Sequence, residues 1–428
     1  MAITLGLVEA IDSNGVYVSM PGSRGVLRGP YLTLQDVAVG DRVLTVTTDD
    51  GETVAVSSRP GLPDAVFNVL DFGATGDGVT DDTLALQGAF DAAIPGQTLL
   101  LPAGKTFRHT GVLTVATNDI VITGGGTLLA TEEETSAVLV TGDRVSINGV
   151  TFRMGATTSR WTEYEQMKLR IHADGVTVRN VKVDGSAAAG IHVDQSSNFL
   201  IEDVLVMDTR ADAIHITYGS HHGRVVRPLC IRAGDDGVAV VSYVNDGVIC
   251  HDIDIIGARQ VGQLWGRAFS VVGGNNITFR DIESNFSAGA AIYIACEDSF
   301  NTYGVDNVLV DGAVLSNSNR QADETAAWRP SPAEGRIVHG AVILFNGQAA
   351  PLAIRNVTMR NVIINDTTPD GYDQVAIRYG LQENLAFHNF TIRGGSEYAW
   401  AVSDVPTTSI RRVGFWQDGF PLPDINGW

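Results

Sequence analysis

Apolar and polar residues alternate along most of this chain in short segments that recur at a near-constant interval. Each segment has about eight residues with an apolar side chain at every second position, the pattern of a half-buried β-strand. Successive segments begin 23 to 31 residues apart, with one longer interval of 49. This period predicts a solenoid whose coils stack to complete a common core, whereas a β-sandwich would show no constant period. The segments begin at Ile120, Val145, Val176, Phe199, Arg224, Val248, Ile277, Val308, Val357 and Leu385.

The first 60 residues follow a different pattern. Short alternating strands rich in β-branched residues are separated by turn sequences such as SNG, PGSRG and DDGE, which predicts a small β module of about five strands. Residues 37–56, VAVGDRVLTVTTDDGETVAV, resemble the OB-like modules of phage baseplate and spike proteins. The resemblance implies a small barrel with an attachment role; the alternative is a generic β module without one. Residues 61–66 are predicted to be a linker.

The character of the chain changes at Phe67. A strand, a turn rich in Gly and Asp, and a helix are predicted there, with Thr80, Asp81 or Asp82 as the helix cap. FGATGDGVTDDTLALQGAF followed by LLLPAGKTF resembles the opening signature of the pectate-lyase-like superfamily. The resemblance implies an all-β fold, a right-handed parallel β-helix over 67–428, whose N-terminal end the helix caps. The predicted apolar side of that helix consists of Leu84, Leu86, Ala89, Phe90 and Ala93.

Composition and charge narrow the classes of function. The formal net charge is −20, and so acidic a surface repels phosphate backbones, which argues against a nucleic-acid-binding protein. Cys230, Cys250 and Cys296 form neither a disulfide framework nor a zinc motif, and we expect buried free thiols. No basic segment followed by an apolar stretch opens the chain, so we expect no secretory signal. No apolar run is long enough for a membrane span.

Charged residues precede several strands at one matching position. Alignment of GIHVDQ, AIHITYG, GVAVVSY, AFSVVGG and GAVILFNG puts one residue of each coil in a column: Ala189, Asp212, Asp236, Arg267 and His339. Neighbouring strands lie about 4.8 Å apart, so Asp212, Asp236 and Arg267 should form a ladder with Asp235 beside it. Carboxylates this close cannot all ionise cheaply, and one should keep a proton near neutral pH. Such a set can protonate a glycosidic oxygen while another carboxylate activates water. Alternatively, these are turn aspartates that accept backbone N–H bonds.

Residues 207–297 resemble the polygalacturonase family of inverting glycoside hydrolases. The family carries N-T-D, G-D-D, G-H-G and R-I-K on successive turns. Here only Asp212 of the first motif is present, Gly234-Asp235-Asp236 is intact, and Arg267 replaces the histidine of the third. No Arg or Lys occurs at the fourth, in AAIYIACED. The resemblance implies that Asp235 is the general acid and that Asp212 and Asp236 position water. Without the R-I-K pair, galacturonate is disfavoured as the substrate.

Two long polar insertions, MGATTSRWTEYEQMK and SNSNRQADETAAWRPSPAEGRIVHG, are predicted to project from the stack as functional loops. Their aromatic residues, with neighbouring ones, are candidates for contact with sugar rings. His192 and His215 occupy equivalent places in adjacent coils and could form a stacked ladder, while His221 and His222 fall in a turn without an expected catalytic role. The candidate substrate-binding residues are Arg267, His215, His339, Trp265, Trp161, Tyr164 and Tyr293, and Trp328 is a further candidate for stacking on sugar.

Cofactors are not required by this interpretation, although Asp208, Asp212 and Asp236 could together offer oxygen ligands to Ca²⁺. A calcium-assisted lyase would need a basic group to abstract a proton, and Arg267 is poorly suited to that role.

The sequence therefore predicts a phage tail-spike-like depolymerase that hydrolyses a host surface polysaccharide by an inverting acid/base mechanism. The alternatives are a polysaccharide lyase on the same fold, and a non-catalytic glycan-binding or structural β-helix. The expected partners are the polysaccharide, other phage tail or baseplate proteins and two further copies of the chain in a homotrimer, with neither nucleic acid nor membrane. The expected location is the virion tail, acting outside the cell at the host surface.

Overall fold

The computed structural model describes residues 66–319, 340–365, 373–394 and 399–427 with their side chains, and the backbone of five strands before them. The chain divides into two compact units, Met1–Phe67 and Asn68–Trp428. In the first unit, five strands close into a barrel in the order β1-β2-β3-β5-β4. These are β1 (Ala2–Asp12), β2 (Gly15–Ser19), β3 (Leu27–Thr33), β4 (Arg42–Thr47) and β5 (Thr53–Ser57).

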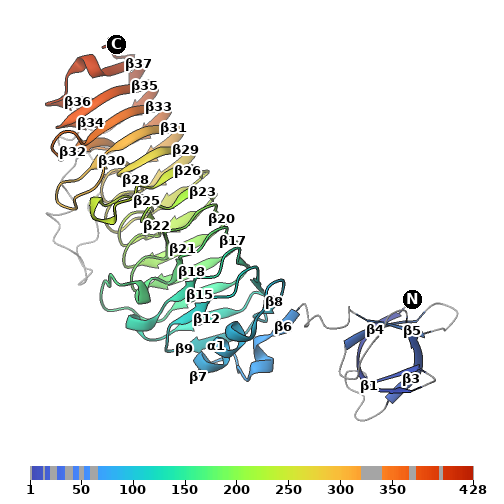
Figure 1. Ribbon diagram of the computed structural model, residues 1–428. Coiled ribbons are helices and arrows are strands. Elements are labelled where there is room, and N and C mark those ends of the chain that lie inside the picture. The colour runs from blue at the N-terminus through green and yellow to red at the C-terminus, as the bar shows by residue number, and fades with distance from the viewer. Residues whose placement is uncertain are drawn as a thin grey trace. The chain divides into compact units, whose positions relative to one another are not determined.

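The second unit is a right-handed parallel β-helix, as predicted (Figure 1). Most coils contribute one strand to each of three parallel faces. The first face contains β8 (Thr98–Leu100), β11 (Val121–Thr123), β14 (Ser146–Asn148), β17 (Thr177–Arg179), β20 (Leu200–Glu202), β23 (His221–Val226) and β26 (His251–Ile256). The second contains β9 (Thr106–His109), β12 (Thr127–Ala130), β15 (Thr151–Met154), β18 (Lys182–Ser186), β21 (Leu205–Thr209), β24 (Leu229–Ile231) and β27 (Arg259–Val261).

Later coils join these two faces in single long strands, because β29 pairs with both β26 and β27. The long strands are β29 (Gly274–Asn285), β31 (Val305–Ser316), β33 (Ala353–Asn365) and β35 (Leu381–Arg393), followed by β37 (Ile410–Gln417). Two short antiparallel strands, β38 (Phe420–Pro421) and β39 (Ile425–Asn426), pair with β37.

The third face is a separate sheet of eleven strands, and it positions the site. Its strands are β10 (Leu113–Val115), β13 (Val138–Val140), β16 (Leu169–Ile171), β19 (Ile191–Asp194), β22 (Ile214–Thr217), β25 (Val238–Val241), β28 (Phe269–Val272), β30 (Ile292–Cys296), β32 (Val342–Asn346), β34 (Val375–Arg378) and β36 (Trp400–Ser403). Alternate residues of β22 and β25 point into the solenoid, where Ile214, Ile216, Val238 and Val240 are fully buried.

Helix α1 (Thr83–Ala92) lies at the N-terminal end of the solenoid and packs against β10, as predicted (Figure 1). It follows β6 (Val66–Asn68), the 3-10 turn η1 (Val69–Phe72) and β7 (Asp77–Asp81). Leu86, Ala89 and Phe90 are buried, whereas Leu84 is 88% exposed and does not belong to the apolar side. Asp82 stands at the N-cap, but its carboxylate accepts the backbone N–H groups of Thr75 and Gly76 instead of capping the helix.

The strand register corrects two of the ten predicted segment starts. In line with Phe199, the residue before β20, stand Gly223 and then Ile253, not Arg224 and Val248. A Cβ atom at Gly223 would overlap the ring of Phe199, which belongs to the preceding coil. The glycine therefore leaves room for this ring inside the solenoid. A pattern of apolar residues cannot reveal an interior glycine, which explains the one-residue shift at Arg224.

All three cysteines are buried free thiols, as expected. Within the ranges given above, no helix is long and apolar enough to cross a membrane. The remaining 3-10 turns are η2 (Glu133–Thr135), η3 (Tyr164–Gln166), η4 (Val244–Asp246) and η5 (Thr407–Ser409).

One charged group lies inside the solenoid, away from the acidic ladder. Lys168 is fully buried; its Nζ donates to the carbonyl oxygen of Ser136 at 2.8 Å and lies 3.3 Å from Nε2 of His109. Burial lowers the pKa of Lys168 from 10.5 to about 7. The unfolded chain therefore binds this proton more strongly than the folded protein, and the free energy of unfolding should rise with pH between about 7 and 10.5.

Lys168→Met should remove this rise, which amounts to at most about 5 kcal/mol over the whole window. The check is the denaturant midpoint of both proteins measured from neutral to alkaline pH. Lys105→Met, at a partly exposed lysine, is the matched control and should leave the rise unchanged. If the rise persists in Lys168→Met, the neutral form of the buried lysine is not its cause.

Candidate active site

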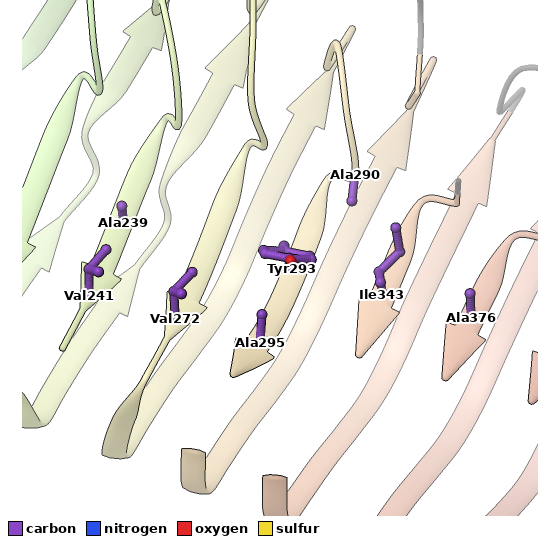
Figure 2. Close-up of a cluster of buried hydrophobic side chains, with 8 residues drawn as sticks. All are labelled: Ala239, Val241, Val272, Ala290, Tyr293, Ala295, Ile343 and Ala376. Atoms are coloured by element: carbon purple, nitrogen blue, oxygen red, sulfur yellow. The ribbon is translucent and has the colours of Figure 1, made fainter. Parts of the chain in front are cut away.

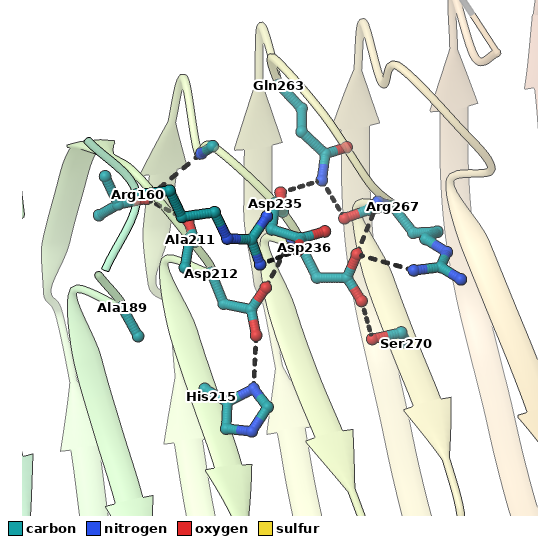
Figure 3. Close-up of polar contacts among 12 residues, drawn as sticks. Arg160, Ala189, Ala211, Asp212, His215, Asp235, Asp236, Gln263, Arg267 and Ser270 are labelled. Carbon is teal, nitrogen blue, oxygen red and sulfur yellow. Dashed lines mark hydrogen bonds and ion pairs between the residues drawn. The ribbon is translucent and has the colours of Figure 1, made fainter. Parts of the chain in front are cut away.

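Three carboxylates and an arginine stand where successive strands of the eleven-stranded sheet begin (Figure 3). Strand pairing aligns Ile214, Val238 and Phe269, so the residues two positions earlier, Asp212, Asp236 and Arg267, form one column. This confirms the predicted register of the three. Ala189 precedes Asp212 in the column, as expected.

The register beyond Arg267 differs from the predicted one. Pairing of β28 with β30 and of β30 with β32 places Ala290 and then Gly340 in line with Arg267. His339 is therefore one position off the column, and it lies outside the described residues, as does Trp328. The cause is that the small-apolar pattern of GAVILF fits two registers one residue apart.

Asp212 is held by partners on both carboxylate oxygens. Its Oδ2 is hydrogen-bonded to Nδ1 of His215, and its Oδ1 accepts the backbone N–H of Asp236 at 2.8 Å. Burial opposes the charge of Asp212, but the hydrogen bond and charge of His215, with the charge of Arg160, lower its pKa. For His215, burial is outweighed by Asp212 and the pKa of the imidazole is raised. Both shifts favour the charged forms, an Asp212 carboxylate beside a His215 imidazolium.

Asp236, one coil further along the solenoid, also accepts hydrogen bonds on both carboxylate oxygens. Its Oδ1 accepts the backbone N–H of Arg267 at 2.7 Å, and its Oδ2 accepts the hydroxyl of Ser270 at 2.5 Å. Burial raises the pKa of Asp236 to about 7; Arg267 opposes this rise, and the charges of Asp235 and Asp212 add to it. Each ladder aspartate thus also caps the turn of the next coil, which was the structural alternative considered for these residues.

Asp235 differs from the other two because no backbone N–H group is among the donors found at its carboxylate. Its Oδ2 accepts a charged hydrogen bond from Nη2 of Arg160 at 2.5 Å, and 18% of its side chain is exposed. Burial is the largest cause of the raised pKa of Asp235; Arg160 opposes the rise, and Asp212 adds to it. Asp235 is therefore the carboxyl group of the three with the most open side chain and a raised pKa.

Arg160 was not predicted. It lies in the first long insertion, 75 residues before Asp235. Burial disfavours its charge, but Asp235, Asp212 and Asp236 together raise its pKa. The only sequence signal for it was the predicted functional role of that insertion, because nothing in the repeat pattern shows where a loop folds back.

Arg267 is held in place by Glu297, which was not predicted from the sequence either. Its Nη2 donates to Oε1 of Glu297 at 2.8 Å, and its guanidinium lies 4.1 Å above the centre of the Tyr293 ring. Tyr293 is 2% exposed, and its hydroxyl donates to the same Glu297 oxygen at 2.8 Å. Tyr293 is therefore corrected from a substrate contact to a support for Arg267.

Tyr293 belongs to an apolar cluster on the outward side of the eleven-stranded sheet (Figure 2). The cluster is formed by Ala239, Val241, Val272, Ala290, Tyr293, Ala295, Ile343 and Ala376. The strands that follow Asp236 and Arg267 therefore carry apolar outward side chains, whereas the strand that follows Asp212 carries His215 in line with Ala239.

Gly266 makes the close approach of the carboxylates possible. Its φ of +71° is in the left-handed region, and a Cβ atom here would collide with Oδ1 of both Asp235 and Asp236. Gln263 stabilises the same turn, because its side-chain Nε2 donates hydrogen bonds to the backbone carbonyl oxygens of Asp235 and Arg267.

Gly266→Ala should displace the two carboxylates and lower kcat/KM by at least about tenfold, since misplacement by 1 Å can cost about 10²-fold. Gly262→Ala is the matched control: its φ is +65°, but its Cβ would meet only Arg232 Cγ at 3.8 Å. Both variants carry the cost of a left-handed alanine, roughly 1–2 kcal/mol. Equal activity of the two variants would show that space beside the carboxylates is not what Gly266 provides.

A cavity of about 430 Å³ opens beside Asp212 and His215. Trp161 and Tyr164, both predicted substrate contacts, line it together with Arg160, Tyr218 and Tyr243. Trp161 is held by a 2.6 Å hydrogen bond from Nε1 to Glu133 and packs on Met167, Ala188 and Ala189. Ala189 and Ala211 also line the cavity, between the coils that carry Trp161 and Asp212. Trp265 is half-buried and is not part of this lining.

His215 also forms the predicted ladder with His192, because their rings stack at 5.2 Å. His192 lines the same cavity, so the ladder forms one wall of it.

The three carboxylates of the ladder are the groups at this site that could bind a metal ion through oxygen. Asp212, Asp235 and Asp236 each offer one oxygen within 4.8 Å of the others, but Arg160 and Arg267 already face them with positive charge. Asp208 does not join this group, since both its oxygens pair with Arg232. Asp208 therefore lies outside the oxygen set considered for Ca²⁺.

Comparison with solved structures gives the class of fold. The catalytic domain of a GH87 α-1,3-glucanase superposes with a TM-score of 0.59 at 16% identity, over 96% of this chain and 83% of that one. The A-module of mannuronan C-5 epimerase AlgE6 from Azotobacter vinelandii gives 0.56 at 16% identity, over 83% and 100%. At this identity the likeness is one of fold, the parallel β-helix.

Sequence comparison gives the family. The family model described as "Rhamnogalacturonase A/epimerase, pectate lyase-like" matches residues 66–292, more than half of the 428, and the chain belongs to this family. Rhamnogalacturonase A of Aspergillus niger is 24% identical over 226 residues, 53% of this chain and 46% of that protein. Mannuronan C5-epimerase AlgE5 of Azotobacter vinelandii is 48% identical over 69 residues, 14% and 7% of the two chains. The chain thus matches less than half the length of either relative.

Proposed function

We propose that this protein hydrolyses glycosidic bonds of a polysaccharide with Asp235 as general acid and with Asp212 and Asp236 as the groups that hold water. The observation that carries the proposal is that three carboxyl groups lie side by side, with one oxygen of each within 4.8 Å of the others, in unlike surroundings. His215 and Arg160 lower the pKa of Asp212 despite its burial, whereas burial raises the pKa of Asp235 and of Asp236. Acid/base cleavage of a glycoside needs one protonated and one ionised carboxyl group in one site.

In the proposed step, the Asp235 carboxyl gives its proton to the leaving glycosidic oxygen as the bond to the anomeric carbon breaks. A water held at Asp212 and Asp236 attacks that carbon and gives up its proton to the ionised carboxylate. The products are two shorter glycans, with one water consumed. Arg160 now contacts Asp235, so substrate must take over part of that contact for the proton to reach the bond.

Inversion is favoured over retention by the hydrogen bonds at the ladder. A retaining enzyme needs a carboxylate oxygen free to bond to carbon. Each oxygen of Asp212 and of Asp236 already accepts a hydrogen bond from the protein, which suits holding water better than covalent attack. The nearest oxygens lie within 4.8 Å, closer than the roughly 6.5–9.5 Å between carboxyl groups in inverting enzymes. Product stereochemistry is therefore the test of this part.

A second candidate activity is β-elimination or epimerisation of a uronate, which begins with removal of a proton next to a carboxylate. His215, Tyr218 and Tyr243 line the cavity with Asp212 and could exchange that proton, and epimerases are among the relatives. Arg160, which lines the same cavity, could neutralise the uronate.

Digestion of a panel of neutral and uronate polysaccharides, followed by mass spectrometry of the fragments, separates these activities. Hydrolysis adds one water for each cut. A lyase yields fragments that lack this water and absorb in the ultraviolet, and an epimerase yields no fragments. We expect fragments with the added water.

We further propose that the protein acts as a tail-spike-like depolymerase on a host surface glycan, in a homotrimer attached to a phage tail through its N-terminal barrel. This rests on the resemblance of residues 37–56 to baseplate and spike modules and on the order of barrel and β-helix in the chain. The mass of the full chain in solution tests the trimer, and a monomer would contradict it.

A further inference from the structure

A group of histidines lies on the outer surface of the solenoid, where strands β23 and β26 begin. The strands pair His221 with His251, so His222 stands beside Asp252 on the adjacent coil. The rings of His221 and His251 stack at 4.6 Å, and the ring of His222 meets His251 edge-on at 5.6 Å. None of these side chains belongs to the acidic ladder or lines the cavity beside it.

The turn position of His222 and Asp252 is elsewhere a ladder of asparagines. All of its members have positive φ, a conformation that Asn and Asp tolerate best among residues with a side chain. In later coils the side-chain amides hydrogen-bond from rung to rung: Asn307 to Asn276 at 3.0 Å and Asn384 to Asn356 at 3.0 Å. The aligned residues are Asn198, His222, Asp252, Asn276, Asn307, Asn356 and Asn384.

Two adjacent coils therefore depart from the amide ladder together. Asparagine adopts the same conformation at five of the aligned positions, so the turn itself does not require a histidine at position 222. The same two coils also carry His221 and His251 one position earlier. As a result, the imidazoles of His222 and His251 and the carboxylate of Asp252 lie close together. Imidazole and carboxylate groups are ligands for divalent transition metals.

The donor atoms have the spacing of a metal site. Nδ1 of His251 is hydrogen-bonded to Oδ2 of Asp252 at 2.7 Å, and Nε2 of His222 lies 3.7 Å from the same oxygen. One donor atom from each residue lies within 4.8 Å of the other two. Ligands at about 2.0–2.1 Å from a tetrahedral zinc ion stand roughly 3.3 Å apart, between the two separations measured here. The other oxygen of Asp252 accepts the amide of Asn276, which orients the carboxylate.

We propose that His222, His251 and Asp252 bind a divalent transition-metal ion of the zinc type, which links two neighbouring coils. Two nitrogen donors disfavour Ca²⁺ and Mg²⁺, which take oxygen ligands. The segments that lead into His221 and His251 carry Tyr218 and Tyr243, which line the cavity. The metal would therefore hold together the two turns that form one side of the candidate substrate site. The proposal does not depend on the reaction proposed above.

The test is titration of the full, untagged chain with ZnCl₂ by calorimetry, with thermal unfolding measured in parallel. The key variant is His222→Asn/Asp252→Asn, which restores the asparagine ladder while removing two of the three ligands. His388→Asn is the control, since His388 lies among Arg360 and Arg411, which would repel a cation. Asp235→Asn is included because the acidic ladder is the other group that could take a cation.

We expect wild type to bind one Zn²⁺ per chain, with a raised unfolding temperature. The double variant should fold, bind Zn²⁺ at least tenfold more weakly and lose the thermal shift, whereas both His388→Asn and Asp235→Asn keep them. MgCl₂ should produce no shift in any of the proteins. Absence of Zn²⁺ binding by wild type, equal binding by the double variant, or loss of binding in Asp235→Asn would each overturn the assignment.

Discussion

Asp235→Asn should abolish glycan cleavage, with a loss of about 10²–10⁴-fold or more in kcat, while the unfolding temperature stays close to that of wild type. The reason for the first part is that the amide cannot supply the proton that the leaving oxygen needs. The reason for the second is that the asparagine oxygen can still accept the hydrogen bond from Arg160. The measurement is release of reducing ends from the best substrate of the panel.

Asp235 gives a cleaner test than its two neighbours. Asp212 and Asp236 each accept a backbone N–H of the next coil, so their substitution would disturb the fold as well as the reaction. Asp208→Asn is the matched control, because Asp208 is an exposed aspartate paired with Arg232 outside the ladder. Undiminished cleavage by Asp235→Asn would exclude this residue as the general acid and favour a glycan-binding role for the ladder.

Arg160→Met should lower kcat/KM by about 10²-fold and move the whole pH–rate profile to higher pH. Arg160 lowers the pKa of Asp212 and opposes the raised pKa of Asp235. Without the cation both pKa values rise. The acidic limb, which reports ionisation of the water-holding group, and the alkaline limb, which reports loss of the acid's proton, should therefore shift in the same direction.

The matched control for this charge is Arg153→Met. Arg153 forms a surface ion pair with Asp184 at 3.1 Å, and we expect its removal to change neither rate nor profile. If Arg160→Met lowers the rate without shifting the pH–rate profile, the guanidinium binds substrate and does not change the pKa values of the carboxyl groups.

The fold and the ladder were accessible from the sequence because both depend on a repeated register. Alternation places every second residue of a strand inside, and stacking at a constant period aligns equivalent positions of neighbouring coils. The sequence alone therefore predicts that Asp212, Asp236 and Arg267 share one column, as strand pairing confirms. The same reasoning failed at His339, where two registers fit the local pattern equally well.

Arg160 and Glu297 were not accessible in this way. Arg160 reaches Asp235 from a loop whose path depends on contacts such as that of Trp161 with Glu133, and no periodicity describes such contacts. Tyr293 was assigned to substrate because aromatic residues often stack on sugars, yet its hydroxyl and ring face are taken by Glu297 and Arg267. Hydrogen-bond partners across a site follow from three-dimensional placement, which residue type alone does not determine.

The stereochemistry of the first products tests the central claim most directly. Proton NMR during cleavage of the preferred polysaccharide shows the anomeric form of each new reducing end before mutarotation. The account predicts reducing ends of inverted configuration that appear with wild type and fail to appear with Asp235→Asn. Products of retained configuration, or unsaturated ends, would contradict water activation by Asp212 and Asp236.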